Sequence, residues 1–391
     1  MRQLNSEYTS NLDQIDDPVP QTCEWILSHD KWKQWKACSS TSLLWITLNA
    51  GWGKSVMAKF LVNYFQYRCD ANTAKNLAYF FFMDGVTGQN DASAAVSALL
   101  HQLYCSQNRL IKHALTKFDG TPIHVFNNFS TLWAILVNSL DDTQRKDVVW
   151  ILDGLDECES RSLRQFVDSI AALIKRPKTT KLKIILLSRP TNQIQHSLGL
   201  FTRADLSDDS CSNKFRLVGE NECDALTADI LHFAQWKIDE LASASAFPEN
   251  VLAHLRERLV AGADYTFLWI SLVMKMIEDS AIDGISESEL GRILETKRIH
   301  DMYCHLLKGT CRTNPAKTRR LLAILLASVR PMTVDEMCAA VEIIEDDNTE
   351  TTKTVRLHKP FDNHIRQLCG HFVRIRRGRI YFVHQTARSF L

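Results

Sequence analysis

The stretch Leu43–Ser55, LLWITLNAGWGKS, decides the fold that this sequence predicts. It opens with a short apolar run, typical of a buried strand, and closes with the glycine-rich turn GWGKS. Beyond the turn, apolar residues recur at helical spacing, at Met57, Phe60, Leu61, Tyr64 and Phe65. Glycines let backbone N–H groups approach a phosphate, and a helix N-terminus adds a favourable dipole. Strand, turn and helix together predict a phosphate-binding loop.

The residues of this turn have distinct expected roles in binding a nucleotide. Gly51 and Gly53 are expected to cradle its phosphates with their backbone. Lys54 is expected to reach the β- and γ-phosphates, and the hydroxyl of Ser55 to ligate Mg²⁺. The alternative interpretation is a chance GxGKS sequence at an ordinary strand–helix turn.

Two departures from the P-loop pattern GxxxxGK(S/T) bear on affinity. Leu48 stands where the pattern has its first glycine, and the bulky Trp52 separates the other two. We expect both to weaken nucleotide binding, although neither removes the Lys-Ser pair. Nucleotide binding is therefore a firmer prediction than hydrolysis.

A second stretch, Val148–Glu157 (VVWILDGLDE), predicts the acidic side of the same site. Asp153 ends an apolar run, where a carboxylate can hold Mg²⁺ through water. Asp156 and Glu157 follow closely and are expected to orient or deprotonate an attacking water. The alternative is a solvated acidic turn that caps the next helix.

A third segment, Ser188-Arg189-Pro190, follows the apolar run LKIILL. Ligands of open parallel sheets bind at the carboxyl ends of the strands. An arginine in that place can sense a γ-phosphate, so Arg189 is a candidate catalytic residue. The alternative is an ordinary surface arginine.

The chain divides into segments of different character. Four apolar runs alternate with helical stretches and predict an α/β fold, a parallel sheet flanked by helices: Leu43–Leu48, Leu77–Phe82, Val148–Leu152 and Leu182–Leu187. We expect a disordered leader over residues 1–20 and a P-loop NTPase domain over 21–205, after which the strands stop. We expect an all-α helical domain over 206–295, with helices at Asn221–Ala242, Glu249–Val260 and Tyr265–Glu278.

The last segment, residues 296–391, predicts a winged-helix domain. Helices are expected near Asp301–Leu307 and Lys317–Val329, and Thr333 with Glu336 forms a capping box for a third. An acidic loop (345–354), a helix ending at Gly370 and a hairpin (372–383) follow. The hairpin carries four arginines, which suggest DNA binding. No basic recognition helix accompanies them, so a solvated hairpin is the favoured interpretation.

The ordered set of motifs resembles fungal NACHT proteins of the STAND class of signal-transduction ATPases, with a nephrocystin-like N-terminal P-loop domain. LLWITLNAGWGKS, AYFFFMDG, WILDGLDEC and ILLSRP carry the resemblance in the sheet, and EWILSHDKWKQW precedes it. ADYTFLWISLV resembles the helical domain of these proteins. LLASVRPMTVDEMCAAV and LCGHFVRIRRGRIYFVHQTARSFL resemble their winged helix, so the likeness extends from about Gln21 to Leu391.

This resemblance implies a switch that binds ATP or ADP with Mg²⁺. In the class, a winged-helix histidine closes over the diphosphate of ADP, and the matching residue is His384. ADP holds a closed state, ATP exchange opens it for self-association and signalling in incompatibility or innate-immunity responses, and slow hydrolysis resets it. Family members carry effector and repeat domains, so we expect this chain to be a fragment, a truncated gene product or a degenerate paralogue.

Three other functions remain open from the sequence. A pseudo-ATPase scaffold would bind nucleotide without turnover, which the leucine in the P-loop permits. A winged-helix regulator of nucleic acid would rest on the arginine hairpin alone. A small-molecule kinase would need a phosphoacceptor lid, and no segment suggests one.

The composition of the chain limits which of these functions are possible. Lys+Arg 46 against Asp+Glu 45 give a net charge of +1, without general attraction to nucleic acid or anionic membranes. The 11 cysteines form no CxxC pair, which favours free thiols in a reducing compartment. The polar N-terminus lacks a signal peptide, and the longest apolar run, Leu321–Val329, is far short of the ~18 residues of a membrane helix. We expect a cytoplasmic protein without a membrane span.

Overall fold

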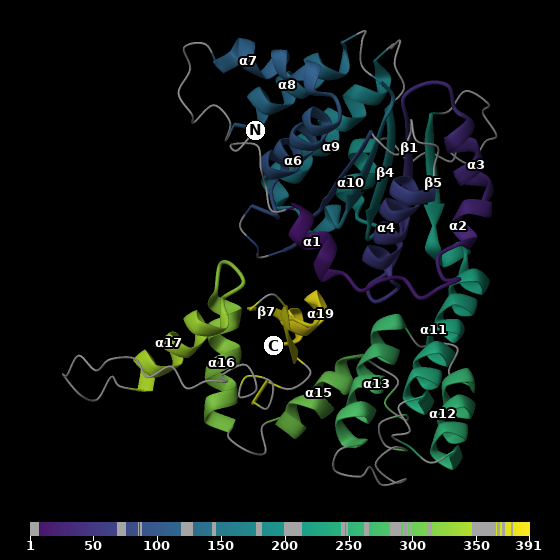
Figure 1. Cartoon of the computed structure of the whole chain (residues 1–391), viewed down its shortest axis with the longest axis vertical. Coiled ribbons are helices and arrows are strands. Elements are labelled where there is room, and N and C mark those ends of the chain that lie inside the picture. Colours follow the sequence, from purple (N-terminus) through teal and green to yellow (C-terminus); the bar gives the residue numbers. More distant parts are fainter. Residues whose placement is uncertain are drawn as a thin grey trace. The chain divides into compact units, whose positions relative to one another are not determined.

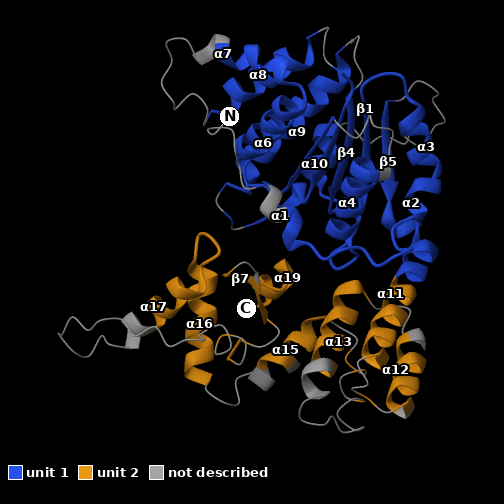
Figure 2. Ribbon diagram, in the orientation of Figure 1, with its two compact units in different colours: residues 1–229 blue, residues 230–391 orange. Residues whose placement is uncertain are grey.

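The computed structural model (Figure 1) contains two compact units, Met1–Asp229 and Ile230–Leu391 (Figure 2). Each unit has a hydrophobic core of its own. The structure describes residues 8–391 except for 69–75, 85, 87, 119–127, 143–145, 177–181, 199–212, 244–246, 248, 262–265, 282–290, 292–293, 295, 297–298, 311–314, 346–364, 366–367, 370–371 and 377.

The first unit is built on a parallel sheet with the strand order β2-β3-β4-β1-β5. Its strands are β1 (Ser42–Thr47), β2 (Leu77–Phe81), β3 (Val148–Asp153), β4 (Leu182–Ser188) and β5 (Lys214–Val218). Every residue of β1 and β3 is buried, as their continuous apolar runs predict for strands covered on both faces. The prediction of a parallel sheet and the four predicted strands are confirmed.

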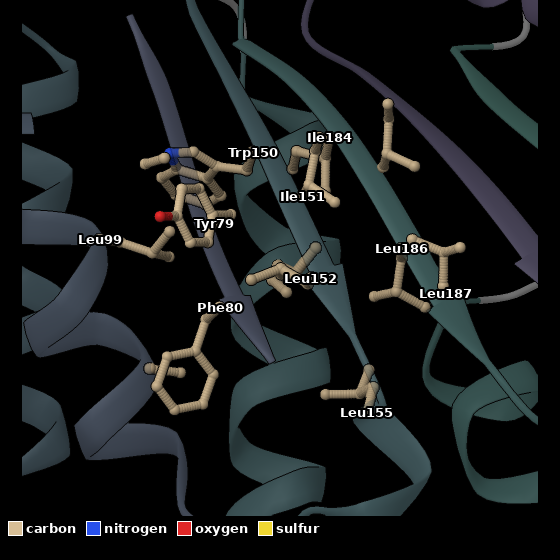
Figure 3. Close-up of a cluster of buried hydrophobic side chains, with 14 of the residues drawn as sticks. Tyr79, Phe80, Leu99, Trp150, Ile151, Leu152, Leu155, Ile184, Leu186 and Leu187 are labelled. Atoms are coloured by element: carbon tan, nitrogen blue, oxygen red, sulfur yellow. The ribbon is translucent and has the colours of Figure 1, made fainter. Parts of the chain in front are cut away.

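Helices flank this sheet and close its core. Among them are α3 (Asp30–Ala37) against β1 and β5, α4 (Lys54–Asn63) against β3 and β4, and α6 (Ala92–Ser106) against β2. Further helices of the unit are α8 (Phe129–Leu140), α9 (Ser160–Lys175) and α10 (Asn192–Leu198). Figure 3 shows aromatic and aliphatic side chains of β2, β3 and β4 packed together with Leu99 of α6. This packing fixes the strand ends that carry the site.

The leader predicted to be disordered is ordered from Tyr8 onward, so that prediction was wrong for residues 8–20. Helix α1 (Tyr8–Gln14) buries Tyr8, whose hydroxyl lies 3.1 Å from Nδ1 of His101. Lys59 of α4 then donates to a backbone carbonyl of the segment at 2.6 Å and pairs with Asp17 at 2.8 Å. A polar composition concealed these anchors because their partners are distant in the sequence.

Strand β5 was missed, and the expectation that strands stop near residue 205 is corrected. Lys214 and Arg216 alternate with Phe215 and Leu217, a pattern of an edge strand with one wetter side. The guanidinium of Arg216 stacks on the buried Trp45 ring of β1, 4.6 Å from its centroid. Because β5 pairs with β1, the sheet continues beyond residue 205, while the bounds of the domain stay a prediction.

The second unit is mainly helical, and α11 (Cys223–Ser243) contains the boundary between the units. With α12 (Glu249–Ala261) and α13 (Phe267–Ala281), it matches the predicted helices. The unit continues with α15 (Ile299–Thr310), α16 (Pro315–Ala327), α17 (Val334–Glu345), β6 (Val373–Arg376), β7 (Arg379–Phe382) and α19 (Gln385–Phe390). Its division into a helical and a winged-helix domain stays a prediction.

The end of this unit has the elements of a winged helix. β6 and β7 form an antiparallel hairpin, and Ile380 N–H donates to the Met332 carbonyl at 2.8 Å, beside an isolated antiparallel bridge between Thr333 and Arg379. The predicted capping box is confirmed: Thr333 N–H donates to Glu336 Oε2 at 2.8 Å, and Glu336 N–H donates to Thr333 Oγ1 at 3.1 Å. Most of the acidic loop at 345–354 and Gly370 lie outside the described residues. None of the described helices is long and apolar enough to cross a membrane.

Candidate nucleotide-binding site

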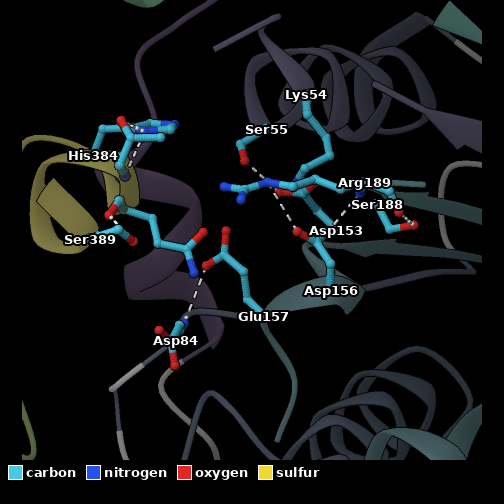
Figure 4. Close-up of polar contacts among 12 residues, drawn as sticks. Lys54, Ser55, Asp84, Asp153, Asp156, Glu157, Ser188, Arg189, His384 and Ser389 are labelled. Carbon is cyan, nitrogen blue, oxygen red and sulfur yellow. Dashed lines mark hydrogen bonds and ion pairs between the residues drawn. The ribbon is translucent and has the colours of Figure 1, made fainter. Parts of the chain in front are cut away.

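The three segments singled out in the sequence meet at the carboxyl ends of neighbouring strands (Figure 4). The P-loop follows β1, Asp153 is the last residue of β3, and Arg189 comes directly after β4. In the sheet, β4 lies between β1 and β3, so all three ends share one edge. The strand order reverses beside β1, which makes this edge the expected ligand crevice of an open α/β sheet.

The glycines of the P-loop are required by its backbone. Gly51 and Gly53 have φ values of 79° and 76°, in the left-handed region that glycine adopts without steric cost. Gly53 is also the N-cap of α4, and its carbonyl accepts from Met57 N–H at 2.9 Å. The helix N-terminus therefore begins where phosphates are expected.

Leu48, which replaces the first glycine of the P-loop pattern, is fully buried. Gly219, a residue outside the motif, leaves room for its side chain. A Cβ atom added to Gly219, just after β5, would lie 2.5 Å from Leu48 Cδ2 and 2.9 Å from the Thr47 carbonyl oxygen. The leucine side chain thus occupies space that only a glycine at 219 leaves open. Trp52, the second departure, is half-buried and packs against the core of the first unit.

Lys54 and Ser55 converge on Asp153. Lys54 Nζ lies 3.3 Å from Asp153 Oδ1, and the Ser55 hydroxyl donates to Asp153 Oδ2 at 2.6 Å. The Lys54 side chain is 10% exposed and that of Asp153 only 3%. Burial alone would lower the pKa of Lys54, but the nearby carboxylates, Asp153 foremost, hold it above its ordinary value. The ammonium therefore stays charged in a largely dry site.

Arg189 and Asp156 form a second, separate pair. The Arg189 N–H donates to Asp156 Oδ1 at 2.9 Å, and Arg189 Nε lies 3.3 Å from Oδ2. The Asp156 side chain is 6% exposed. The structure thus brings these two predicted residues together, at the ends of neighbouring strands.

Glu157 has a different environment from its neighbour. Its Oε2 accepts the Asp84 N–H at 3.2 Å, from the segment after β2. Burial raises the pKa of Glu157 to about 7; Lys54 opposes this, and Asp156 adds to it. The turn before it needs Gly154, because a Cβ there would lie 2.8 Å from the Phe82 carbonyl oxygen, and its φ is 74°.

His384, the remaining predicted ligand, belongs to the second unit. It is the N-cap of α19, and its Nδ1 accepts the Thr386 N–H at 3.1 Å. It stands at the start of a helix and is half-buried. With Nδ1 accepting, a neutral ring carries its proton on Nε2, where it can donate. Its role toward phosphate stays a prediction.

Sequence reasoning missed two supports of this site. Gly219 lies outside the motifs, and only its contact with Leu48 identifies it. Asp84 is in AYFFFMDG, which the sequence offered only as a likeness; its backbone N–H is what contacts the site. Neither support has a local sequence signal.

Two family models and a curated relative match this chain. Residues 21–189 match the family model "Nephrocystin 3, N-terminal", and residues 307–391 match "GPI inositol-deacylase, winged helix domain". The vegetative incompatibility protein HET-E-1 of Podospora anserina is 28% identical over 376 residues, 94% of this chain. The chain spans only 26%, about a quarter, of the length of that relative.

Solved structures also align along nearly the whole chain, at low identity. The Walker-type ATPase PABY2304 of Pyrococcus abyssi is 12% identical with a TM-score of 0.39, covering 97% of this chain and 99% of its own. The ORC2 protein of Aeropyrum pernix is 11% identical with a TM-score of 0.36, covering 100% and 96%. The two family matches and the relative aligned along most of the chain confirm the resemblance: this chain is similar to the N-terminal domain of nephrocystin 3 over residues 21–189, to the winged-helix domain of GPI inositol-deacylase over residues 307–391, and to a vegetative incompatibility protein over most of its length.

Proposed function

We propose that this chain is an ATP- and ADP-dependent molecular switch that binds its nucleotide with Mg²⁺ at the P-loop. The observation that carries the proposal is the convergence of Lys54, Ser55 and Asp153 beside two left-handed glycines. Hydroxyl and carboxylate oxygens are the ligands that Mg²⁺ prefers, and those of Ser55 and Asp153 lie 2.6 Å apart. The residues present therefore fit Mg²⁺, which would neutralise phosphate charge there.

Binding would exchange partners within the site. Lys54 is held by Asp153, whose charge Mg²⁺ would take over when the metal and nucleotide arrive together. The Lys54 ammonium would then bind the phosphates, while Gly51 and Gly53 donate from their backbone N–H groups. A buried charge that always has a partner avoids the cost of desolvating it alone.

Hydrolysis, if the switch is reset in this way, belongs to Glu157. A general base works best when its pKa is near the working pH, and the pKa of Glu157 is about 7. It would take a proton from the attacking water. Its neighbour Asp156 is engaged by Arg189 and is the weaker candidate. We propose that turnover is slow.

The switch itself would be a shift in population between two states. A ligand moves such an equilibrium only by its difference in affinity for the two states. We propose that Arg189 reads the γ-phosphate, that His384 favours an ADP-bound closed state, and that the ATP state self-associates in signalling. The match to an incompatibility protein supports this assignment.

Nucleotide titration tests the binding proposal. The Lys54→Ala variant should lose at least tenfold in affinity for ADP and ATP with Mg²⁺, because a hydrogen bond to a charged group contributes about 1.5–3 kcal/mol. Lys33→Ala is a matched control, since that lysine is 62% exposed on α3. Equal affinity of wild type and Lys54→Ala would reject the P-loop site.

Single-turnover phosphate release tests hydrolysis. It should fall in Glu157→Gln while ADP affinity persists. The second candidate function is a non-hydrolysing scaffold, which the leucine in place of the first P-loop glycine favours. A wild-type chain that releases no more phosphate than a heat-inactivated sample would establish that alternative.

We propose that the winged helix serves the switch and does not read DNA sequence. The net charge of the chain is +1, and one arginine of the hairpin, Arg379, donates from Nη1 to the Pro331 carbonyl at 3.1 Å. Its charge is thus used partly in packing. Sequence-selective retention on DNA that survives raised salt would contradict this proposal, because non-specific phosphate contacts decay steeply with salt.

A further inference from the structure

Asp156 and Glu157 are adjacent in the sequence, yet their carboxylates have different partners. Both oxygens of Asp156 face one residue: Oδ1 accepts the Arg189 N–H at 2.9 Å, and Oδ2 lies 3.3 Å from Arg189 Nε. Glu157 instead accepts the Asp84 N–H from the segment after β2. The first carboxylate is part of an ion pair between two strand ends, and the second is not.

The backbone of Arg189 is held from both sides. Asp156 accepts its N–H, while the Ser188 hydroxyl donates to its carbonyl at 3.0 Å. The same hydroxyl accepts from Nε1 of the buried Trp45 at 2.8 Å. These bonds tie the start of the loop after β4 to β1 and to the DGLDE turn. Hydrogen bonds that fix the backbone of a residue also limit the directions that its side chain can take, as a binding residue requires.

The orientation of the guanidinium follows from the atom that is bonded. Asp156 engages Nε on one edge of the guanidinium, an edge that Nε shares with one terminal nitrogen; the fork formed by the two terminal nitrogens lies at the far end of the group. In Figure 4 the guanidinium extends in the direction of Ser55, the proposed Mg²⁺ ligand. A forked, planar donor in a fixed direction is suited to phosphate oxygens.

We propose that Asp156 is a positioning residue that sets the preference for ATP over ADP by holding Arg189, and that it is not the proton acceptor. The inference rests on the proposed nucleotide switch and names the residue that sets its selectivity. Two carboxylates in one turn then have separate roles: Asp156 orients the cation that reads the third phosphate, and Glu157 acts on the water.

Competition between ADP and a non-hydrolysable ATP analogue, AMP-PNP, tests this assignment in the presence of Mg²⁺. Asp156→Asn cannot accept at both positions, so Arg189 should lose its orientation. We expect affinity for AMP-PNP to fall about tenfold or more, while ADP affinity changes less than about threefold. Arg189→Gln should behave alike, and the double variant should be no worse than Arg189→Gln alone, because the two residues act as one unit.

A matched control lies at the opposite edge of the sheet. Asp141 and Arg176 also form a pair, with Oδ2 and Nη1 3.2 Å apart, before the starts of β3 and β4. Asp141→Asn should leave the ratio of the two affinities unchanged. Glu157→Gln should also keep the ratio while phosphate release falls.

Three results would overturn the inference. In the first, Asp156→Asn keeps the ATP preference but loses phosphate release, which assigns Asp156 to proton transfer. In the second, both affinities fall equally with a lower melting temperature, which assigns it to stability. In the third, Arg189→Gln leaves the ratio of the two affinities as it is in wild type, which leaves the binding site standing but removes the reading of the third phosphate by Arg189. Binding of neither would instead reject the proposed function, and this inference with it.

Discussion

The two edges of the parallel sheet each hold a partly buried lysine, and the two lysines have opposite kinds of partner. At the amino edge, Lys183 of β4 donates to the carbonyls of Trp35 and Cys38 at 2.6 and 2.5 Å and to the Ser42 hydroxyl at 3.0 Å. At the carboxyl edge, Lys54 is paired with the carboxylate of Asp153. One cation is bound to neutral groups fixed in the fold, and the other to a charge that a ligand can replace.

The difference separates a structural lysine from a functional one. Carbonyls at the end of α3 lack partners within the helix, and a cation there also suits the helix dipole. A carboxylate, by contrast, is also a metal ligand, so its hold on Lys54 can be exchanged for phosphate. The type of partner, more than burial, tells the two lysines apart.

Replacing Lys183 should give the largest change in stability. Lys183→Met leaves two backbone carbonyls and a hydroxyl without their donor, each costing roughly 1–3 kcal/mol when buried. Because Lys183 is only partly buried, we expect the free energy of unfolding to fall by about 3 kcal/mol in total, measured by urea denaturation. Nucleotide affinity of the folded protein should persist.

The control for this change is Lys33→Met on α3, whose side chain is 62% exposed. It should alter stability by less than about 0.5 kcal/mol. If Lys183→Met reduced nucleotide affinity and spared stability, the contrast between the two edges would be lost.

Substitution of Gly219 should affect both stability and binding, to an intermediate extent. A Cβ there meets Leu48 Cδ2 at 2.5 Å and the Thr47 carbonyl at 2.9 Å, so the root of the P-loop must shift. Gly219→Ala should cost about 1–3 kcal/mol of stability and weaken ADP binding. Leu48→Ala removes one of the two clashes, so the losses of the double variant should be smaller than the sum of the losses of the two single variants.

Gly291→Ala is a suitable comparison, because a Cβ at that helical glycine would meet nothing within 4 Å. It should be neutral or slightly stabilising. An additive double variant, with no recovery by Leu48→Ala, would show that the leucine does not set the shape of the P-loop.

The smallest expected effect is a pH dependence from Glu157. Its pKa is raised by burial to about 7 in the fold, so the folded chain binds this proton more tightly than the unfolded chain does. The resulting stabilisation is complete below the unfolded pKa and is lost as pH rises through about 7. Melting temperatures of wild type and Glu157→Gln without nucleotide should therefore diverge between acidic and mildly alkaline pH, with wild type losing more. Parallel curves would contradict the raised pKa.

The sequence predicted the sheet where its strands are continuous apolar runs, as in β1 and β3. It failed for β5, because Lys214 and Arg216 interrupt the run and the strand takes its place through pairing with β1. It failed for the leader because α1 depends on one aromatic residue and on the distant Lys59. A local sequence pattern indicates which residues are buried, but it does not indicate which distant residues they contact.

The candidate site divides in the same way. Each motif predicted its own residues, and parallel topology then placed Lys54, Asp153 and Arg189 at one edge. The separate roles of Asp156 and Glu157 were beyond the motif, because neighbours in the sequence differ here only in what they contact. The motifs also did not predict that Leu48 fills the space beside Gly219, since these residues follow β1 and β5 and are far apart in the sequence.

The attachment of the N-terminal segment to helix α4 has a mechanical consequence. Lys59 grips this segment five positions beyond Lys54 on the same helix, a separation of about 7.5 Å along its axis. Tension applied ahead of Tyr8 would be borne first by the small anchor around that tyrosine and then by Lys59. A force applied at this end of the chain would thus be transmitted to α4, the helix whose first turn carries Lys54.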